Sequence, residues 1–194
     1  MRYFQRIAAG VDVLPLAHAL QRKPYLWGAE PMRTLVHNGP HAEVDDVLLR
    51  FEDVPPALAA KASEGGAEAW AEFEALPLAF RPAWTELPEA KPLIQGLMVR
   101  VGAYELGRVV ITKLRPGGCI YPHADTGAYS ETPDRSRYHV VLNSTPGSTF
   151  RCANEAVYMA PGDIWWFDPQ SVHSVENNGV DDRLHLLVDV RIAP

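Results

Sequence analysis

The stretch of sequence that decides the fold is RVVITKLRPGGCIYPH, residues 108–123. It holds two short apolar runs, and Pro116, Gly117 and Gly118 stand between them as a turn signal. Short apolar runs that are bounded by Pro and Gly are typical of β-strands. We therefore predict strands at 108–114 and 119–123.

The same pattern continues toward the end of the chain. Further strands are predicted at 138–142, 148–152, 156–159, 163–167, 172–176 and 184–190. Pro-Gly pairs at 146–147 and 161–162 and the Asn-Asn-Gly run at 177–179 supply turns between them. So many short strands in one half of the chain favour a mainly β fold, a double-stranded β-helix of the jelly-roll or cupin-like type.

Upstream of residue 106 the signals are mixed. Helical patterns occur near 12–20, 67–76 and 86–101, and short strands are predicted at 33–36 and 47–51. No internal repeat or low-complexity linker separates the two halves. We therefore expect a single domain, 1–194, in which a mixed helical and strand flank (1–105) caps a barrel core (106–194).

Composition excludes several classes of partner. The chain has 194 residues, of which 47% are hydrophobic, and this is ample for one globular core. Its net charge of −6 provides no global positive field, so we expect neither nucleic acid nor a membrane surface as partner. Two cysteines, Cys119 and Cys152, form no disulfide framework, and no signal-type or membrane-spanning segment is apparent. A cytoplasmic location is expected, whereas the oligomeric state is not predicted.

The sharpest chemical feature is His123-Ala124-Asp125, at the end of a predicted strand. Residues i and i+2 of a strand project to one face, so the imidazole and the carboxylate can reach one point. His173, on a later predicted strand, is the expected third ligand. Two histidines and one carboxylate leave open positions on Fe(II), which an oxygen-activating centre needs.

A second tripeptide, His41-Ala42-Glu43, imitates the first. Seven histidines and 24 acidic residues in the chain give about one His-x-Asp/Glu match by chance. No strand-rich sequence with a later His and Arg follows this copy directly. We interpret His41 and Glu43 as part of a solvated loop.

Arginines downstream of the tripeptide suggest carboxylate ligands. Arg183 follows His173 on the next predicted strand, and its rigid fork of donors suits the distal carboxylate of 2-oxoglutarate. The alternative is that Arg183 pairs with Asp181 or Asp182 in the adjoining turn.

Arg137 and His139 share one face of a strand that could point into the barrel, or alternatively into water. Arg151, on the next predicted strand, could extend the same positive patch. These arginines favour a substrate that bears a carboxylate.

Residues 112–190 resemble the catalytic domain of the aspartyl/asparaginyl β-hydroxylase family of Fe(II)/2-oxoglutarate-dependent dioxygenases. Three blocks carry the resemblance: 112–118 with Pro122 and His123; 137–139 with 150–155; and 167–168 through His173 to Arg183 and 188–190. The resemblance implies iron at His123 and His173, and the 2-oxoglutarate tail at Arg183, assisted by the hydroxyl of Thr112. It further implies that His139 contacts the cosubstrate and that Arg137 binds substrate. Some animal members have Gly where this chain has Asp125. The metal triad is therefore complete in this chain, and the substrates of those members are a weaker guide to its own substrate.

The activity implied by the resemblance is hydroxylation of a C–H bond by Fe(II), 2-oxoglutarate and O2, with 2-oxoglutarate decarboxylated to succinate. The substrate is expected to be an amino acid, a peptide residue or a small molecule that carries a carboxylate or amide. Open alternatives are desaturation, hydroxylation of a free amino acid such as proline, a cupin-like metal-binding barrel without oxygenase activity, and a catalytically silent structural barrel. A metal barrel without oxygenase activity would have no use for Arg183.

Overall fold

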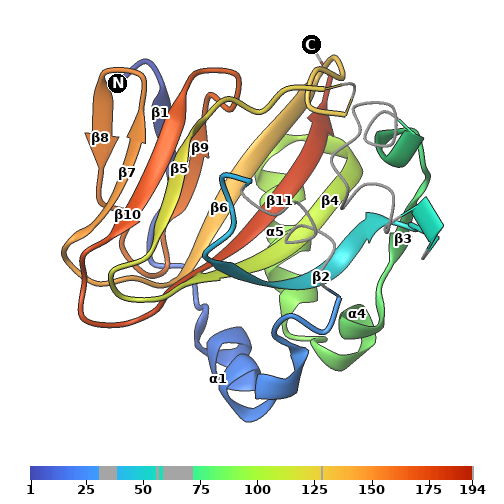
Figure 1. Ribbon diagram of the computed structural model, residues 1–194, viewed down its shortest axis with the longest axis horizontal. Coiled ribbons are helices and arrows are strands. Elements are labelled where there is room, and N and C mark those ends of the chain that lie inside the picture. Colours follow the sequence, from blue (N-terminus) through green and yellow to red (C-terminus); the bar gives the residue numbers. More distant parts are fainter. Residues whose placement is uncertain (31–38, 56, 59–71, 128, 194) are drawn as a thin grey trace.

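The computed structural model describes residues 1–30, 39–55, 57–58, 72–127 and 129–193 (Figure 1). Two antiparallel sheets face each other. The larger has the order β1 (Phe4–Ala8), β9 (Ile164–Phe167), β6 (Arg135–Asn143), β11 (Arg183–Ile192), β4 (Ala103–Leu114), β2 (Val44–Glu52) and β3 (Leu78–Phe80). The smaller has the order β5 (Cys119–His123), β10 (His173–Asn177), β7 (Ser148–Cys152) and β8 (Glu155–Val157). The mainly β, double-stranded β-helix fold is thereby confirmed.

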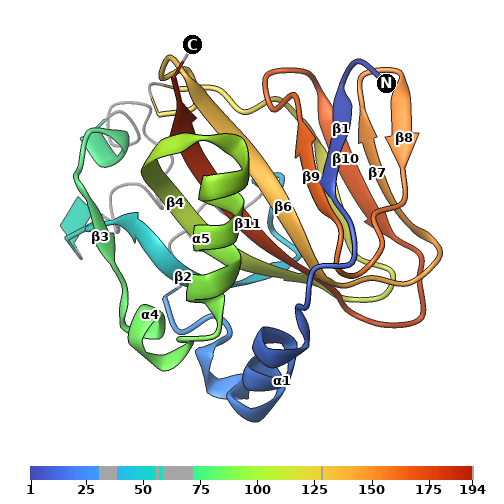
Figure 2. The same ribbon diagram turned by 180° about the vertical axis from the view of Figure 1, so that it is seen from behind.

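The helices cover the outer face of the large sheet (Figure 2). They are α1 (Leu14–Arg22), a 3-10 turn at Pro24–Leu26, α4 (Pro82–Glu86) and α5 (Ala90–Val101). In α5 the buried positions Ala90, Leu93, Ile94 and Leu97 recur at helical spacing and so form one apolar face. The helix ends at Gly102, whose φ of 67° is the left-handed conformation that favours glycine there.

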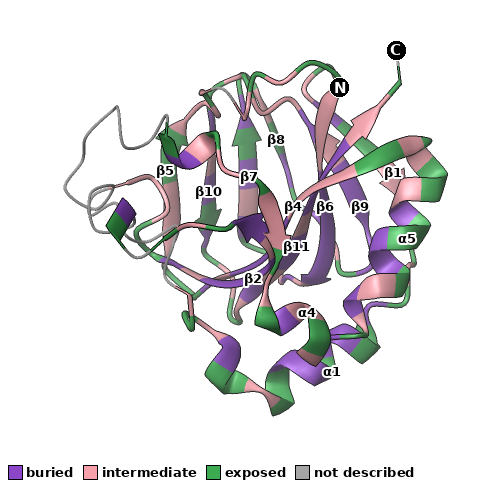
Figure 3. Cartoon of the chain, turned by 90° about the vertical axis from the view of Figure 1, so that its right-hand side faces the viewer, coloured by how far each residue is buried: buried purple, intermediate pink, exposed green. Residues whose placement is uncertain are grey.

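Two apolar layers hold these parts together, and the buried side chains concentrate along the strands (Figure 3). One cluster fills the space between the sheets and includes Phe4, Leu114, Phe150, Trp165 and Phe167. The other joins the helices to the back of the large sheet. Because both faces of the large sheet are covered, its central strands are largely buried.

Most predicted elements lie where the sequence placed them. The strands at 119–123 and 148–152 have the predicted bounds, and β4 begins earlier than predicted, at Ala103. The helix predicted at 86–101 corresponds to α5, which begins later, at Ala90, and α4 before it was not predicted. The predicted strand at 33–36 and most of the helix at 67–76 lie outside the described residues.

Two short strands escaped prediction. β1 pairs with β9, with Phe4 opposite Phe167, and β3 pairs with the end of β2. Both are short, and pairing with a distant strand stabilises them more than their own sequence does. Through β1, β2 and β3, the first half of the chain contributes directly to the large sheet.

Both cysteines are free thiols. Among the described residues, no helix has the length and apolar character needed to cross a bilayer.

Candidate active site

The inner face of the large sheet carries a row of functional side chains on each of three adjacent strands. Alternate residues of a strand share a face, and the register aligns the rows: Asp189 lies opposite Arg137, and His185 lies opposite Thr112. The rows are Arg183, His185, Leu187 and Asp189 on β11; Arg135, Arg137 and His139 on β6; and Arg108, Val110 and Thr112 on β4. The site is therefore built on rigid strands.

The small sheet supplies the two histidines of the candidate metal centre. His123 at the end of β5 is paired directly with His173 at the start of β10. The Nδ1 of His123 lies 2.7 Å from the carbonyl of Tyr121, and that of His173 lies 2.9 Å from the carbonyl of Ser171. An Nδ1–H donated to a carbonyl fixes the tautomer and leaves each Nε2 lone pair available to a metal.

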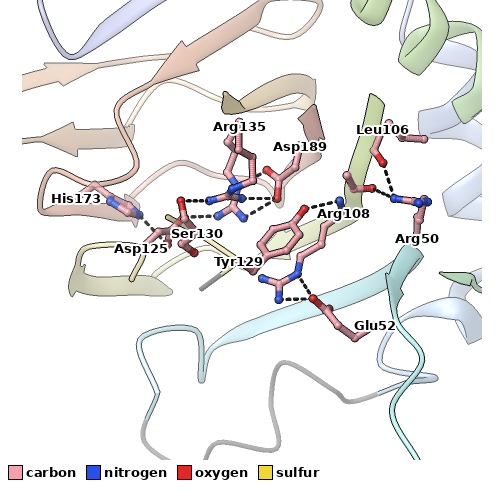
Figure 4. Close-up of polar contacts among 12 residues, drawn as sticks. Arg50, Glu52, Leu106, Arg108, Asp125, Tyr129, Ser130, Arg135, His173 and Asp189 are labelled. Carbon is pink, nitrogen blue, oxygen red and sulfur yellow. Dashed lines mark hydrogen bonds and ion pairs between the residues drawn. The ribbon is translucent and has the colours of Figure 1, made fainter. Parts of the chain in front are cut away.

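Asp125 completes the cluster, but it does so from a loop. β5 ends at His123, so the expected sharing of one strand face is not what brings the carboxylate here. Instead, the backbone N–H of Asp125 donates to the carbonyl of Pro169 at 2.8 Å and holds the turn. The Oδ1 of Asp125 lies 3.6 Å from Nε2 of His123. It lies 3.9 Å from Nε2 of His173 (Figure 4).

The protonation states of the cluster suit a cation. Burial lowers the pKa of His173 to about 4, so its imidazole is neutral near pH 7. Burial would raise the pKa of Asp125, but the Arg137 guanidinium, followed by His173 and His123, lowers it overall. The Nε2 of His123 is buried and has no hydrogen-bond partner among the described residues. A buried ring nitrogen that faces a carboxylate and a second imidazole fits a divalent metal with open positions.

Arg183 is buried beside this cluster, at 3% exposure, and the described residues provide no carboxylate partner for it. Its Nη2 donates to Nδ1 of His185 at 3.2 Å, and its guanidinium lies 5.7 Å from the centre of the Phe150 ring. Burial lowers the pKa of Arg183 to about 9. The alternative pairing with the adjoining turn is wrong, because among the described residues Arg183 forms no ion pair with Asp181 or Asp182 and contacts His185 instead. The amide of Asn143 donates to Asp181 Oδ2 and to the carbonyl of Asp182.

A small cavity of about 30 Å³ connects Arg183 with the metal-ligand cluster. His139 and Thr112 line it, as do both histidines of the cluster. His185 accepts from Arg183, so the Nδ1 of His139, 3.1 Å away, donates to the same His185 nitrogen. Burial lowers the pKa values of His139 and His185 well below the usual range, with Arg183 adding to the effect. The two imidazoles nearest to Arg183, those of His139 and His185, are thus neutral near pH 7.

Arg137 occupies a different environment. Its Nε and Nη2 donate to Asp189 at 2.7 and 3.0 Å, and its Nη1 donates to Asp125 Oδ2. Asp189 also accepts from Arg135 at 2.9 Å (Figure 4). Burial would raise the pKa of Asp189, but these arginines lower it to about 2. The sequence suggested that Arg137 binds substrate, and the structure shows that two carboxylates of the protein already occupy most of its donors.

A larger cavity of about 270 Å³ lies on the other side of Asp125. Arg137, Leu187 and His41 line both cavities, so the two meet at the metal-ligand cluster. Its other walls combine apolar and charged side chains: Phe51, Phe73, Val110, Glu74, Arg108 and Asp189.

Arg151 is not part of the site. Along β7, Phe150 and Cys152 are buried and Arg151 between them is exposed. The strand alternation therefore directs Arg151 outward, away from the cavity that Phe150 lines.

Two residues of the site were missed by sequence reasoning. His41 was interpreted as a solvated loop residue, but its ring packs edge-on against that of His123 with centroids 4.7 Å apart. The backbone explains this, because the N–H of Tyr121 donates to the carbonyl of Pro40 at 3.1 Å. The second residue, Asp189, stands in the block 188–190 that carries the family resemblance, but the sequence reasoning assigned it no role.

Similarity to known proteins was assessed once this geometry was established. L-Proline cis-4-hydroxylase of Rhizobium meliloti (strain 1021) is 32% identical over 79 residues, which are 41% of this chain and 28% of that relative. The match therefore spans less than a third of the relative's length.

Solved structures with a similar fold include a prolyl-4-hydroxylase from Pseudomonas putida and a cupin 2 domain-containing protein from Halorhodospira halophila. The first has a TM-score of 0.48 at 18% identity and covers 98% of this chain and 93% of its own. The second has a TM-score of 0.34 at 14% identity and covers 44% and 52%.

A family model described as aspartyl/asparaginyl beta-hydroxylase matches residues 41–192, the part of the chain that contains the three clustered ligands and most of the residues that line the two cavities. With most of its length matched in this way, the chain belongs to the aspartyl/asparaginyl β-hydroxylase family.

Proposed function

We propose that this protein is an Fe(II)/2-oxoglutarate-dependent dioxygenase that hydroxylates a C–H bond of an amino acid. The observation that carries the proposal is Arg183, a buried cation that lacks a carboxylate partner in the described structure and lines the same small cavity as His123 and His173. An uncompensated buried charge is costly, so its presence favours an anionic ligand that completes the pair.

His123, Asp125 and His173 would hold the metal, because their ligating atoms lie within 4.8 Å of one another. Bound Fe(II) would supply the activation of O2, with one oxygen atom entering the product alcohol and the other entering succinate as 2-oxoglutarate loses CO2. The carbonyls of Tyr121 and Ser171 orient the two imidazoles for this task.

The small cavity would hold the cosubstrate. Arg183 would bind its distal carboxylate, and Thr112 and His139 line the same space. The Nε2 of His139 is buried without a partner among the described residues, and the donation of its Nδ1–H to His185 leaves it as an acceptor. Phe150 and Phe167 form apolar walls that exclude water from this side of the metal centre.

The larger cavity would hold the substrate. Its volume of about 270 Å³ suits a small molecule or one side chain, and Asp125 in its wall brings the substrate next to the metal centre. The sequence relative named as an L-proline hydroxylase favours an amino acid. Arg137 borders this cavity, and we assign it the role of orienting Asp125 while it contacts the substrate.

The test is release of succinate by the Fe(II)-loaded protein across a panel of free amino acids and peptides, with the hydroxylated product identified by mass. We expect succinate release to depend on one class of substrate. Metal-loaded, folded protein that shows no charge-transfer absorbance with 2-oxoglutarate in the absence of oxygen would contradict the proposal and favour a cupin-like metal barrel.

A further inference from the structure

Glu74 stands out among the charged residues that line the larger cavity. The other acids there are compensated: Asp125 pairs with Arg137, and Asp189 pairs with both Arg135 and Arg137. Within the described ranges, no hydrogen bond or ion pair is formed by the partly buried carboxylate of Glu74. Among the described residues, the carboxylate of Glu74 is therefore the acidic group of this cavity whose negative charge no protein cation compensates.

Glu74 lies against the loop that carries Asp125. Gly127, two residues after Asp125, has a φ of +100°, in the left-handed region that favours glycine. A Cβ at Gly127 would approach Oε1 of Glu74 to 2.8 Å and Oε2 more closely still. The positive φ favours glycine at this turn, and the close approach shows that the Glu74 carboxylate lies directly over the loop beside the metal-ligand cluster.

Arg108 provides the opposite charge in the same cavity. Its Nε donates to Glu52 Oε1 at 2.7 Å, its Nη2 donates to the same oxygen, and its guanidinium stacks on the Tyr129 ring at 3.7 Å (Figure 4). These contacts hold the group rigidly, and Nη1 is given no partner by the described residues. The cavity therefore contains a rigidly held guanidinium donor, Arg108, as well as the uncompensated carboxylate of Glu74.

We propose, on the basis of the function proposed above, that Glu74 binds the ammonium group of a free amino acid and selects it over a peptide residue or N-acylated amino acid. The α-ammonium group of a free amino acid compensates the carboxylate of Glu74, whereas the amide nitrogen of a peptide residue or N-acylated amino acid carries no positive charge. The substrate carboxylate would face Arg108, and the side chain would face the metal-ligand cluster. Binding in this way compensates the charge of Glu74 and gives Nη1 of Arg108, whose charge is already paired with Glu52, an acceptor.

The experiment compares wild type with Glu74→Gln and with Glu72→Gln as the matched control. Glu72 is an exposed glutamate two residues away, so the same change there leaves the cavity intact. Each protein, loaded with Fe(II) and 2-oxoglutarate, is assayed for succinate release with the twenty standard L-amino acids and with their Nα-acetyl counterparts. Binding of 2-oxoglutarate in the absence of oxygen is measured first for all three proteins and confirms folded, loaded sites.

The expected result is that wild type and Glu72→Gln prefer the free amino acid over its acetylated form by at least about tenfold in kcat/KM. Glu74→Gln should lose about ten- to hundredfold for the free amino acid and change less than about twofold for the acetylated one, because a charged hydrogen bond is lost. Equal losses on both forms, no loss at all, or wild-type turnover of acetylated forms alone would overturn the inference. So would a wild type that binds 2-oxoglutarate but responds to no free amino acid. Failure of the proposed function is distinct, because 2-oxoglutarate would then fail to bind at the first step.

Discussion

Arg183 and Arg137 lie on neighbouring strands of one sheet and are both largely buried, yet their surroundings are opposite. Arg137 donates to the carboxylates of Asp125 and Asp189. Arg183 contacts the neutral ring of His185 and the face of Phe150. The contrast distinguishes two roles of a buried cation. A cation that protein carboxylates compensate, such as Arg137, stabilises the fold, whereas a cation without such a partner, such as Arg183, indicates an anionic ligand.

The largest effect on stability is expected at the compensated arginine. Arg137→Met leaves Asp125 and Asp189 without their main partner, so the free energy of unfolding should fall by about 3–5 kcal/mol. Urea denaturation of the metal-free protein measures this loss. The matched control is Arg151→Met at the exposed position of β7, which should change stability by less than about 0.5 kcal/mol. Equal effects at the two positions would contradict the scaffold role of Arg137.

Lowering the pH should reduce the stability of the region around Arg183, because the buried histidines there are neutral in the folded protein. His139, His173 and His185 all have lowered pKa values in the fold, mainly through burial, whereas the unfolded chain takes up protons near pH 6.5. The contribution of these histidines to the free energy of unfolding is therefore complete above pH 6.5. It decreases as the pH falls below 6.5, because the unfolded chain then binds protons that the folded protein does not.

Between pH 7.5 and 5.5, each of these histidines should remove about 1.4 kcal/mol, and the three together about 4 kcal/mol. Urea denaturation of the metal-free protein at the two pH values measures the difference. A flat profile would show that the three imidazoles are not held neutral.

Arg183→Met should change the free energy of unfolding in the opposite direction to Arg137→Met. Removal of an uncompensated buried cation should raise the free energy of unfolding of the ligand-free protein by about 1 kcal/mol. The same denaturation assay applies, and Arg137→Met serves as the contrasting variant. A loss of several kcal/mol from Arg183→Met would mean that the protein itself compensates this charge.

The sequence predicted the residues of the site better than their roles. Strand periodicity placed His139 on a face that could point into the barrel or into water, and it placed Arg183 on the strand after His173. The structure brings both to the small cavity. It could not distinguish the roles of Arg137 and Arg183, because the decisive partner, Asp189, reaches Arg137 only through the register between β11 and β6. Such long-range pairing has no local signature.

The same reason explains the outcome for His41 and Arg151. His41 was assigned to a solvated loop because its tripeptide lacks a strand context, and the contact with His123 arises from the pairing of loop and β5 backbones. Arg151 was placed in the positive patch by its strand alone, although strict alternation with Phe150 and Cys152 directs it outward. Assigning the face of a strand requires knowing which neighbours are core, and here the buried Phe150 and Cys152 decide it.

The central claim is that the uncompensated guanidinium of Arg183 binds the distal carboxylate of 2-oxoglutarate. The most direct test is calorimetric titration of 2-oxoglutarate, without oxygen, into Fe(II)-loaded wild type and Arg183→Met, with iron content measured in both. We expect iron to be retained in both proteins and affinity for 2-oxoglutarate to fall at least about thirtyfold in the variant. Equal affinity in the two proteins, or no binding to wild type, would contradict the account.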